Sequence, residues 1–135
     1  MASVHREVLI EAAADDIWAV IRDFGTGPTR MAPGFVAGTR IEADGRVVTF
    51  VNGTVVREKL VGLDDDARRI AYSIVGDTLR PAHDNSSMQV FAEEPGRSRF
   101  VWIHDVLPDE LAPQLAAAME QGLKVVKRTF ESVTA

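Results

Sequence analysis

The chain has 135 residues, of which 46% are hydrophobic and 26% charged, and its formal charge is −5 at pH 7. These values are ordinary for a globular protein, and we expect a single domain over residues 1–135 that needs no disulfide or metal to fold. The acidic balance argues against a nucleic acid partner, because binding phosphates needs a concentrated basic surface and no dense Lys/Arg run occurs.

Cysteine is absent, which excludes disulfides, thiolate nucleophiles and cysteine metal sites. The first seven residues are too polar for a signal peptide and no long apolar run occurs, so we expect a cytoplasmic protein without membrane insertion. We also expect no metal and no cofactor, because no phosphate or dinucleotide loop occurs and the three histidines lack ligand spacing. Monomer and homodimer both remain open.

The N-terminal part of the chain predicts one strand and two short helices. Residues 4–11 are predicted to form the strand. A helix is predicted over 15–24, where apolar residues recur at helical spacing. Asp15 and Asp16 lie in its first turn, where the helix dipole favours negative charge. A single helical turn is predicted next, ending at Met31.

The middle of the chain alternates between strands and tight turns. Asp44-Gly45 and Asn52-Gly53 indicate hairpins, because both pairs accept the positive φ angles of a type I′ turn. Two more turns are indicated at 64–66 and 94–96. With the first strand, seven strands are predicted, the other six being 35–42, 46–51, 54–63, 69–76, 83–92 and 97–106.

The last predicted element is a long helix over residues 109–133. Asp109 is expected to cap it after Pro108, and Pro113 is tolerated in its first turn, where its missing N–H costs little. Apolar residues form one stripe along it. Helices kept apart from a run of antiparallel strands predict an α+β domain.

Three stretches of the chain are similar to a known family. Residues 14–24 resemble its first helix, residues 56–65 a strand and turn with a pair of aspartates, and residues 100–102 the segment before the long helix. In this order they resemble the START-like (SRPBCC) superfamily, which includes birch-pollen-allergen-like proteins, bacterial polyketide cyclases, lipid carriers and plant abscisic-acid receptors. The resemblance covers nearly the whole chain. It implies the helix-grip fold, a curved antiparallel sheet of seven strands around a long C-terminal helix, with two short helices after the first strand.

The Asn52-Gly53 turn predicts which side chains face the helix. A two-residue turn pairs Val47 with Glu58, and cross-strand partners share a face. Glu58 is then the only formal charge on the inner face, where an unpaired carboxylate is costly. This favours a ligand or a reaction for Glu58, and in ligand-binding relatives the matching carboxylate lies in the cavity. The alternative is a Glu58 at the rim that pairs with an arginine. The opposite face is expected to face solvent, and it carries Arg46, Val48, Phe50, Val55, Arg57, Lys59 and Val61.

Three later strands supply further inner-face candidates. Tyr72, the sole tyrosine, is expected inside, as a ligand contact or as a core residue with a satisfied hydroxyl. Alternation over 83–92 places Asp84, Ser86, Met88 and Val90 inward. In abscisic-acid receptors a tyrosine lines the pocket where this chain has Asp84, which argues against a shared ligand.

The face of strand 97–106 depends on the length of the turn before it. We favour the register that turns Phe100, Trp102 and His104 inward, because the larger aromatic mass belongs inside; the other register turns Val101, Ile103 and Asp105 inward. His104 then lies near the carboxylates and becomes a candidate for proton transfer. The alternative is a core histidine with satisfied hydrogen bonds.

The candidate catalytic residues are therefore His104 and Glu58. Met31, Phe35, Leu115 and Met119 are expected to supply apolar wall. The favoured hypothesis is binding of a small hydrophobic ligand, such as a lipid, an isoprenoid or a polyketide-like molecule. The alternatives are a cofactor-independent polyketide cyclase or dehydratase with an acid–base pair, and a protein–protein interaction domain with a filled cavity, since the fold alone does not choose a function. The candidate ligand-binding residues are Met31, Phe35, Glu58, Tyr72, Asp84, Ser86, Met88, Trp102, His104, Leu115 and Met119.

Overall fold

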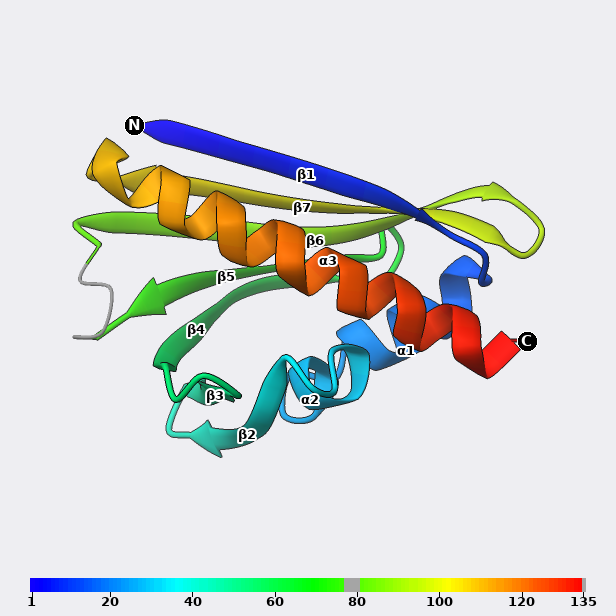
Figure 1. Cartoon of the computed structure of the whole chain (residues 1–135), viewed down its shortest axis with the longest axis horizontal. Coiled ribbons are helices and arrows are strands. Elements are labelled where there is room, and N and C mark those ends of the chain that lie inside the picture. The colour runs from blue at the N-terminus through cyan, green and yellow to red at the C-terminus, as the bar shows by residue number, and fades with distance from the viewer. Residues whose placement is uncertain (77–80, 135) are drawn as a thin grey trace.

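The computed structural model describes residues 1–76 and 81–134. Within these ranges seven antiparallel strands form one curved sheet in the order β1-β7-β6-β5-β4-β3-β2, so the first strand pairs with the last (Figure 1). This confirms the predicted α+β class and the number of strands. The strands are β1 (Ala2–Ile10), β2 (Val36–Glu42), β3 (Gly45–Phe50), β4 (Val55–Asp64), β5 (Arg69–Val75), β6 (His83–Glu94) and β7 (Arg97–Leu107).

The helices lie on one side of this sheet. The two short helices α1 (Ala14–Ile21) and α2 (Gly27–Met31) follow β1, and the long helix α3 (Ala112–Thr134) crosses in front of the strands (Figure 1). Helix α1 buries Ile17, Trp18 and Ile21, which recur at helical spacing, and ends three residues before the predicted boundary. No helix in the described ranges is long and apolar enough to cross a membrane.

The start of the long helix differs from the expected capping. Asp109 opens a 3₁₀ turn (Asp109–Leu111) whose N-cap residue is Pro108, so Asp109 is not itself the cap of the α-helix. Its carboxylate lies 3.3 Å from the amino group of Met1. Pro113 is the second residue of α3, where its missing N–H leaves no bond unmade.

The hairpin between β3 and β4 has a different register from the predicted one. Arg46 pairs with Glu58, and the Phe50 N–H donates to the Thr54 carbonyl at 2.8 Å, so the loop has three residues instead of two. Gly53 takes the left-handed conformation at the third loop position, with φ of +93°. One extra loop residue turns β3 over. The prediction that Glu58 faces inward is therefore correct, and the prediction that Arg46, Val48 and Phe50 face solvent is wrong.

The hairpin between β6 and β7 has the favoured register. Met88 pairs with Trp102 and Ser86 with His104, so the aromatic face of β7 turns inward with the expected residues of β6. A β-bulge near Ala92 accommodates the turn after Glu94. Both strands therefore present their predicted faces to α3, including β7, for which the sequence left two registers open.

Two groups of buried apolar side chains hold the helices on the sheet. The larger group joins α1, α2 and the second half of α3 to the strands, and includes Ile17, Phe100 and Phe130. The smaller group lies under the first half of α3 and contains Val56, Ile74, Val106 and Leu115. Space is left on the inner face of the sheet where these groups meet.

Candidate functional site

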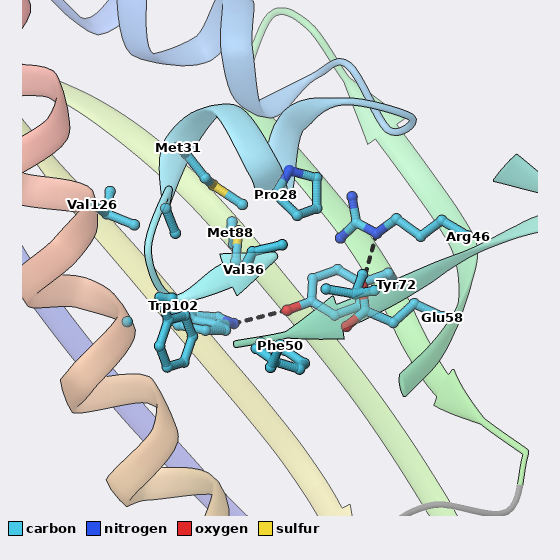
Figure 2. Close-up of a pocket in the computed structure, with 14 residues that line it drawn as sticks. Pro28, Met31, Val36, Arg46, Phe50, Glu58, Tyr72, Met88, Trp102 and Val126 are labelled. Carbon is cyan, nitrogen blue, oxygen red and sulfur yellow. Dashed lines mark hydrogen bonds and ion pairs between the residues drawn. The ribbon is translucent and has the colours of Figure 1, made fainter. Parts of the chain in front are cut away.

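Two cavities lie between the inner face of the sheet and α3. The outer cavity measures about 290 Å³ and lies between the β3–β4 turn and the first half of α3. The inner cavity measures about 40 Å³ and lies beneath α2 and the second half of α3 (Figure 2). The volumes of ligand pockets begin at about 300 Å³, so the outer cavity is large enough for a small ligand. The inner cavity is large enough only for one chemical group of such a ligand.

Among the described residues, five side chains line both cavities and form the partition between them. These are Phe35, Phe50, Glu58, Tyr72 and Trp102. The rings of Phe35 and Phe50 meet edge to face with centroids 5.3 Å apart. A group at the partition therefore contacts aromatic surface together with the polar atoms of Glu58 and Tyr72.

Helix α3 approaches the partition closely at Gly122. A Cβ atom at that position would lie 3.1 Å from Cε2 of Phe35 and 3.2 Å from Cζ3 of Trp102. These distances are tighter than ordinary carbon contacts. The glycine thus allows both rings to pack directly against the backbone of the helix.

A buried ion pair stands at the inner end of the site. Arg46 Nε donates to Glu58 Oε1 at 2.8 Å, and the two side chains are only 3% and 9% exposed. Arg46 Nη1 also donates to the Phe24 carbonyl at 3.1 Å, and the guanidinium lies 4.2 Å from the centre of the Phe24 ring and 5.1 Å from that of Tyr72. Both alternatives considered for Glu58 are thus partly realised, because it lines the cavity and also pairs with an arginine.

Sequence reasoning missed Arg46 for an identifiable reason. The assumed two-residue turn put Arg46 on the outer face and left Glu58 alone inside. An unpaired carboxylate on an inner face is itself a costly arrangement. A register that places Arg46 opposite Glu58 removes that cost. The cost of an unpaired Glu58 could therefore have indicated the correct register from the sequence.

Tyr72 stands between the ion pair and Trp102. Its hydroxyl accepts a hydrogen bond from Trp102 Nε1 at 2.9 Å (Figure 2). Burial raises the pKa of Tyr72 well above its ordinary value, and the negative charge of Glu58 raises this pKa further. The phenol therefore keeps its proton. An indole nitrogen can only donate, so the hydroxyl proton remains available for another acceptor.

His104 belongs to a second polar cluster on the wall of the outer cavity. Its Nδ1 lies 3.0 Å from Asp84 Oδ2 and 2.7 Å from Ser86 Oγ. Asp84 Oδ1 accepts from Ser86 Oγ and from the Ile74 N–H, both at 2.9 Å. The carboxylate thus orients the imidazole. Ser86 is fully buried and lies closest to the same ring nitrogen that faces Asp84, so this cluster does not have the arrangement of a serine nucleophile and its base.

The structure places nine of the predicted ligand-binding residues on the cavity walls. Asp84 and Ser86 are on the inner face, as predicted, but line neither cavity and instead support His104 from behind. Besides Arg46 and Gly122, sequence reasoning did not single out Phe50, whose strand was expected to face the other way. The nine are Met31 and Met88 on the inner cavity, His104, Leu115 and Met119 on the outer cavity, and Phe35, Glu58, Tyr72 and Trp102 on both.

Solved structures of the same fold include proteins with known activities. The chain superposes on XoxI of Bacillus cereus with a TM-score of 0.88 at 19% identity, covering 100% of this chain and 99% of that one. The Zhui aromatase/cyclase of Streptomyces gives 0.71 at 20% identity, covering 97% and 92%. Norcoclaurine synthase of Thalictrum flavum, solved with dopamine and hydroxybenzaldehyde, gives 0.70 at 17% identity, covering 98% and 86%. At these identities the likeness establishes the helix-grip fold.

The sequence itself matches a family model along almost its full length. A search of the curated proteins finds no match. The model of the family described as polyketide cyclase / dehydrase and lipid transport matches residues 1–131, in agreement with the START-like resemblance of the three stretches. The chain therefore belongs to the polyketide cyclase / dehydrase and lipid transport family.

Proposed function

We propose that the protein binds a small, largely apolar molecule in the outer cavity. The observation that carries this proposal is a cavity of about 290 Å³ with a mainly apolar wall, in which Glu58, Tyr72 and His104 supply buried polar groups. This combination is typical of small-molecule sites, where apolar surface gives affinity and a few polar groups orient the ligand. The family includes lipid transport, which supports the same proposal. Cytoplasmic location stays a prediction from the sequence.

Native mass spectrometry of the purified protein, followed by solvent extraction, tests this proposal. We expect a bound apolar molecule, either carried from the host or taken up from a panel of lipids and aromatic polyketides. Ala118 lines the outer cavity, so Ala118→Trp should fill it and abolish the bound mass. Lys124→Trp puts the same indole at an exposed position of α3 that lines neither cavity and should bind normally. No uptake by the wild-type protein from any source would refute the proposal and favour a protein partner.

A second candidate function, that of a cyclase or dehydratase, is favoured by the setting of His104. A buried imidazole held by Asp84 at the wall of a cavity can remove a proton next to a ketone and return it to a departing hydroxyl group. The balanced reaction is the loss of water from a β-hydroxyketone, which leaves an enone. Aromatase/cyclase activity in a protein of the same fold supports this candidate.

Dehydration of 4-hydroxy-4-phenylbutan-2-one offers a direct assay, because the conjugated product absorbs in the near ultraviolet. We expect the wild-type protein to accelerate it and His104→Gln to lose the acceleration. His5→Gln, at an exposed position of β1, should retain it. Equal rates for the two variants would remove His104 from this role, and a wild-type rate equal to the buffer rate would favour a binding protein.

A further inference from the structure

Three polar groups on the inner cavity have hydrogen-bonding capacity that the protein does not use. Arg46 uses Nε and Nη1, and Nη2 has no partner among the described residues. Glu58 uses Oε1, and its Oε2 likewise has no partner in the described part of the chain. The Tyr72 hydroxyl accepts from Trp102 and keeps its own proton to donate.

These atoms face space instead of being sealed in protein. Among the described residues no buried side-chain nitrogen or oxygen lacks a hydrogen-bond partner. Arg46 Nη2 and Glu58 Oε2 must therefore keep accessible surface, although their side chains are 97% and 91% covered. The inner cavity is the space that both residues line, together with Tyr72 (Figure 2).

The size of the inner cavity limits what it can hold. Its volume is about 40 Å³, and one water-sized group needs roughly 10–15 Å³ on the same measure. It therefore admits the end of a molecule and not its body. Glu58 and Tyr72 also line the outer cavity, so a molecule in the outer cavity can extend a polar end across the partition to reach them.

The charges select a neutral group. The positive charge of Arg46 is already balanced by Glu58 at 2.8 Å. A carboxylate or phosphate would bring a second negative charge next to Glu58 Oε2, and like charges repel strongly beside a side chain that is only 9% exposed. A hydroxyl group can donate to Glu58 Oε2 while accepting from Arg46 or Tyr72, and a ketone can accept from either donor.

We propose that the inner cavity is a head-group subsite that binds a neutral hydroxyl or ketone oxygen at the end of an apolar ligand whose body occupies the outer cavity. This inference rests on the proposed binding function and adds a chemical class to it. The ligand is an alcohol, a phenol or a ketone, and the anionic form of a fatty acid or a phosphate ester is excluded. Arg46 and Glu58 act together. Arg46 alone would attract an anion, and the negative charge of Glu58 makes the subsite favour a neutral group.

Three naphthalenes that differ only in the head group test the subsite. Naphthalene, 2-naphthol and 2-naphthoate present a hydrogen, a neutral hydroxyl and a carboxylate on the same apolar body at pH 7. Equilibrium dialysis with absorbance detection gives their dissociation constants. We expect 2-naphthol to bind at least about tenfold more tightly than either of the others, since one net hydrogen bond to a charged group gives about this factor.

The variant Glu58→Gln removes the negative charge of residue 58 while nearly keeping the shape of its side chain. It leaves Arg46 as an unbalanced buried cation, so 2-naphthoate should gain about tenfold or more in affinity and 2-naphthol should lose its advantage. A residue with a merely structural role would weaken all three compounds together. If Glu58→Gln does not fold, Arg46→Met/Glu58→Leu removes both charges at once and should bind all three compounds with similar affinity.

The possible outcomes distinguish a failure of the proposed subsite from a failure of the proposed ligand-binding function. Tight binding of naphthalene that Ala118→Trp abolishes, without a preference for 2-naphthol, would overturn the subsite and leave the binding function standing. No binding of any of the three compounds by the wild-type protein would count against both. A preference for 2-naphthol that survives in Arg46→Met/Glu58→Leu would assign the preference to another part of the cavity and overturn the role of the ion pair.

Discussion

Arg46 Nε lies 2.8 Å from Glu58 Oε1, and the two residues face each other across neighbouring strands with almost no exposure to solvent. Removing two charges from water costs several kcal/mol each, and their attraction offsets this only when the geometry is good. Arg46 adds a bond to the Phe24 carbonyl and contacts two aromatic rings, which helps to hold its charge at this depth.

Breaking this pair from one side should destabilise the protein strongly. Glu58→Gln is expected to lower the free energy of unfolding by about 3–5 kcal/mol, because a buried cation is left without its partner. Urea unfolding monitored by circular dichroism measures the change.

The matched control removes both partners. Arg46→Met/Glu58→Leu should lie within about 1–2 kcal/mol of the wild-type protein, because no unpaired charge remains and the space is refilled. If the double variant is as unstable as Glu58→Gln, the loss comes from packing and not from the unpaired charge.

Tyr72 should make stability fall at high pH. Burial and the charge of Glu58 raise the pKa of Tyr72 in the folded protein above the value near 10 that an unfolded tyrosine has. Above about pH 10 the unfolded chain therefore releases this proton while the folded protein retains it, so the free energy of unfolding decreases as pH rises.

Absorbance of tyrosinate can follow this directly, because Tyr72 is the only tyrosine. The signal should appear only together with unfolding, well above pH 10. In Tyr72→Phe the signal disappears and the alkaline loss of stability becomes smaller. Titration of the folded wild-type protein near pH 10 would contradict the burial of the phenol.

Gly122→Ala should destabilise the protein even though alanine is the better helix former. The new Cβ would stand 3.1–3.2 Å from the rings of Phe35 and Trp102, and crowding of this kind in a packed site typically costs about 1–3 kcal/mol. Thermal unfolding measures the net effect. The Trp102 indole resonance should shift, because its ring must move.

Ala117→Gly provides the comparison on the same helix. Ala117 is exposed, so this change should cost about 1 kcal/mol from helix propensity alone. If Gly122→Ala instead stabilises the protein by a similar amount, the rings yield freely and the close approach of the helix is unimportant.

Asp84→Ala should cost more than about 2 kcal/mol. The carboxylate accepts hydrogen bonds from the Ile74 N–H and Ser86 and faces His104 Nδ1, and removing it leaves buried donors unpaired. Asp105→Ala serves as the control, because that carboxylate accepts from Ser3 in an exposed setting and should cost less than about 1 kcal/mol. Similar losses for both would mean that the cluster behind His104 contributes little.

The orientation of each strand was predictable where a single argument decided it. The sequence of β7 offers two registers, and the larger aromatic mass on one face selected the correct one. Hairpin β3–β4 was different, because Asn52-Gly53 fits either a two-residue turn or the last two positions of a three-residue loop. The two choices differ by one residue and turn β3 over, so Arg46 changed faces while Glu58 did not.

Apolar spacing and turn residues act over a few neighbouring positions, so they were enough to predict the order of the elements, the α+β class and the inward face of β6. The family was predicted from the resemblance of three stretches of the sequence, and for β7 the sequence favoured one of two registers. The pairing of Arg46 with Glu58, the partition between the two cavities and the position of Asp84 behind His104 became apparent only in the three-dimensional structure. Each of these depends on side chains from separate elements meeting at distances of about 3–5 Å, and no local pattern along one strand or helix specifies such a meeting.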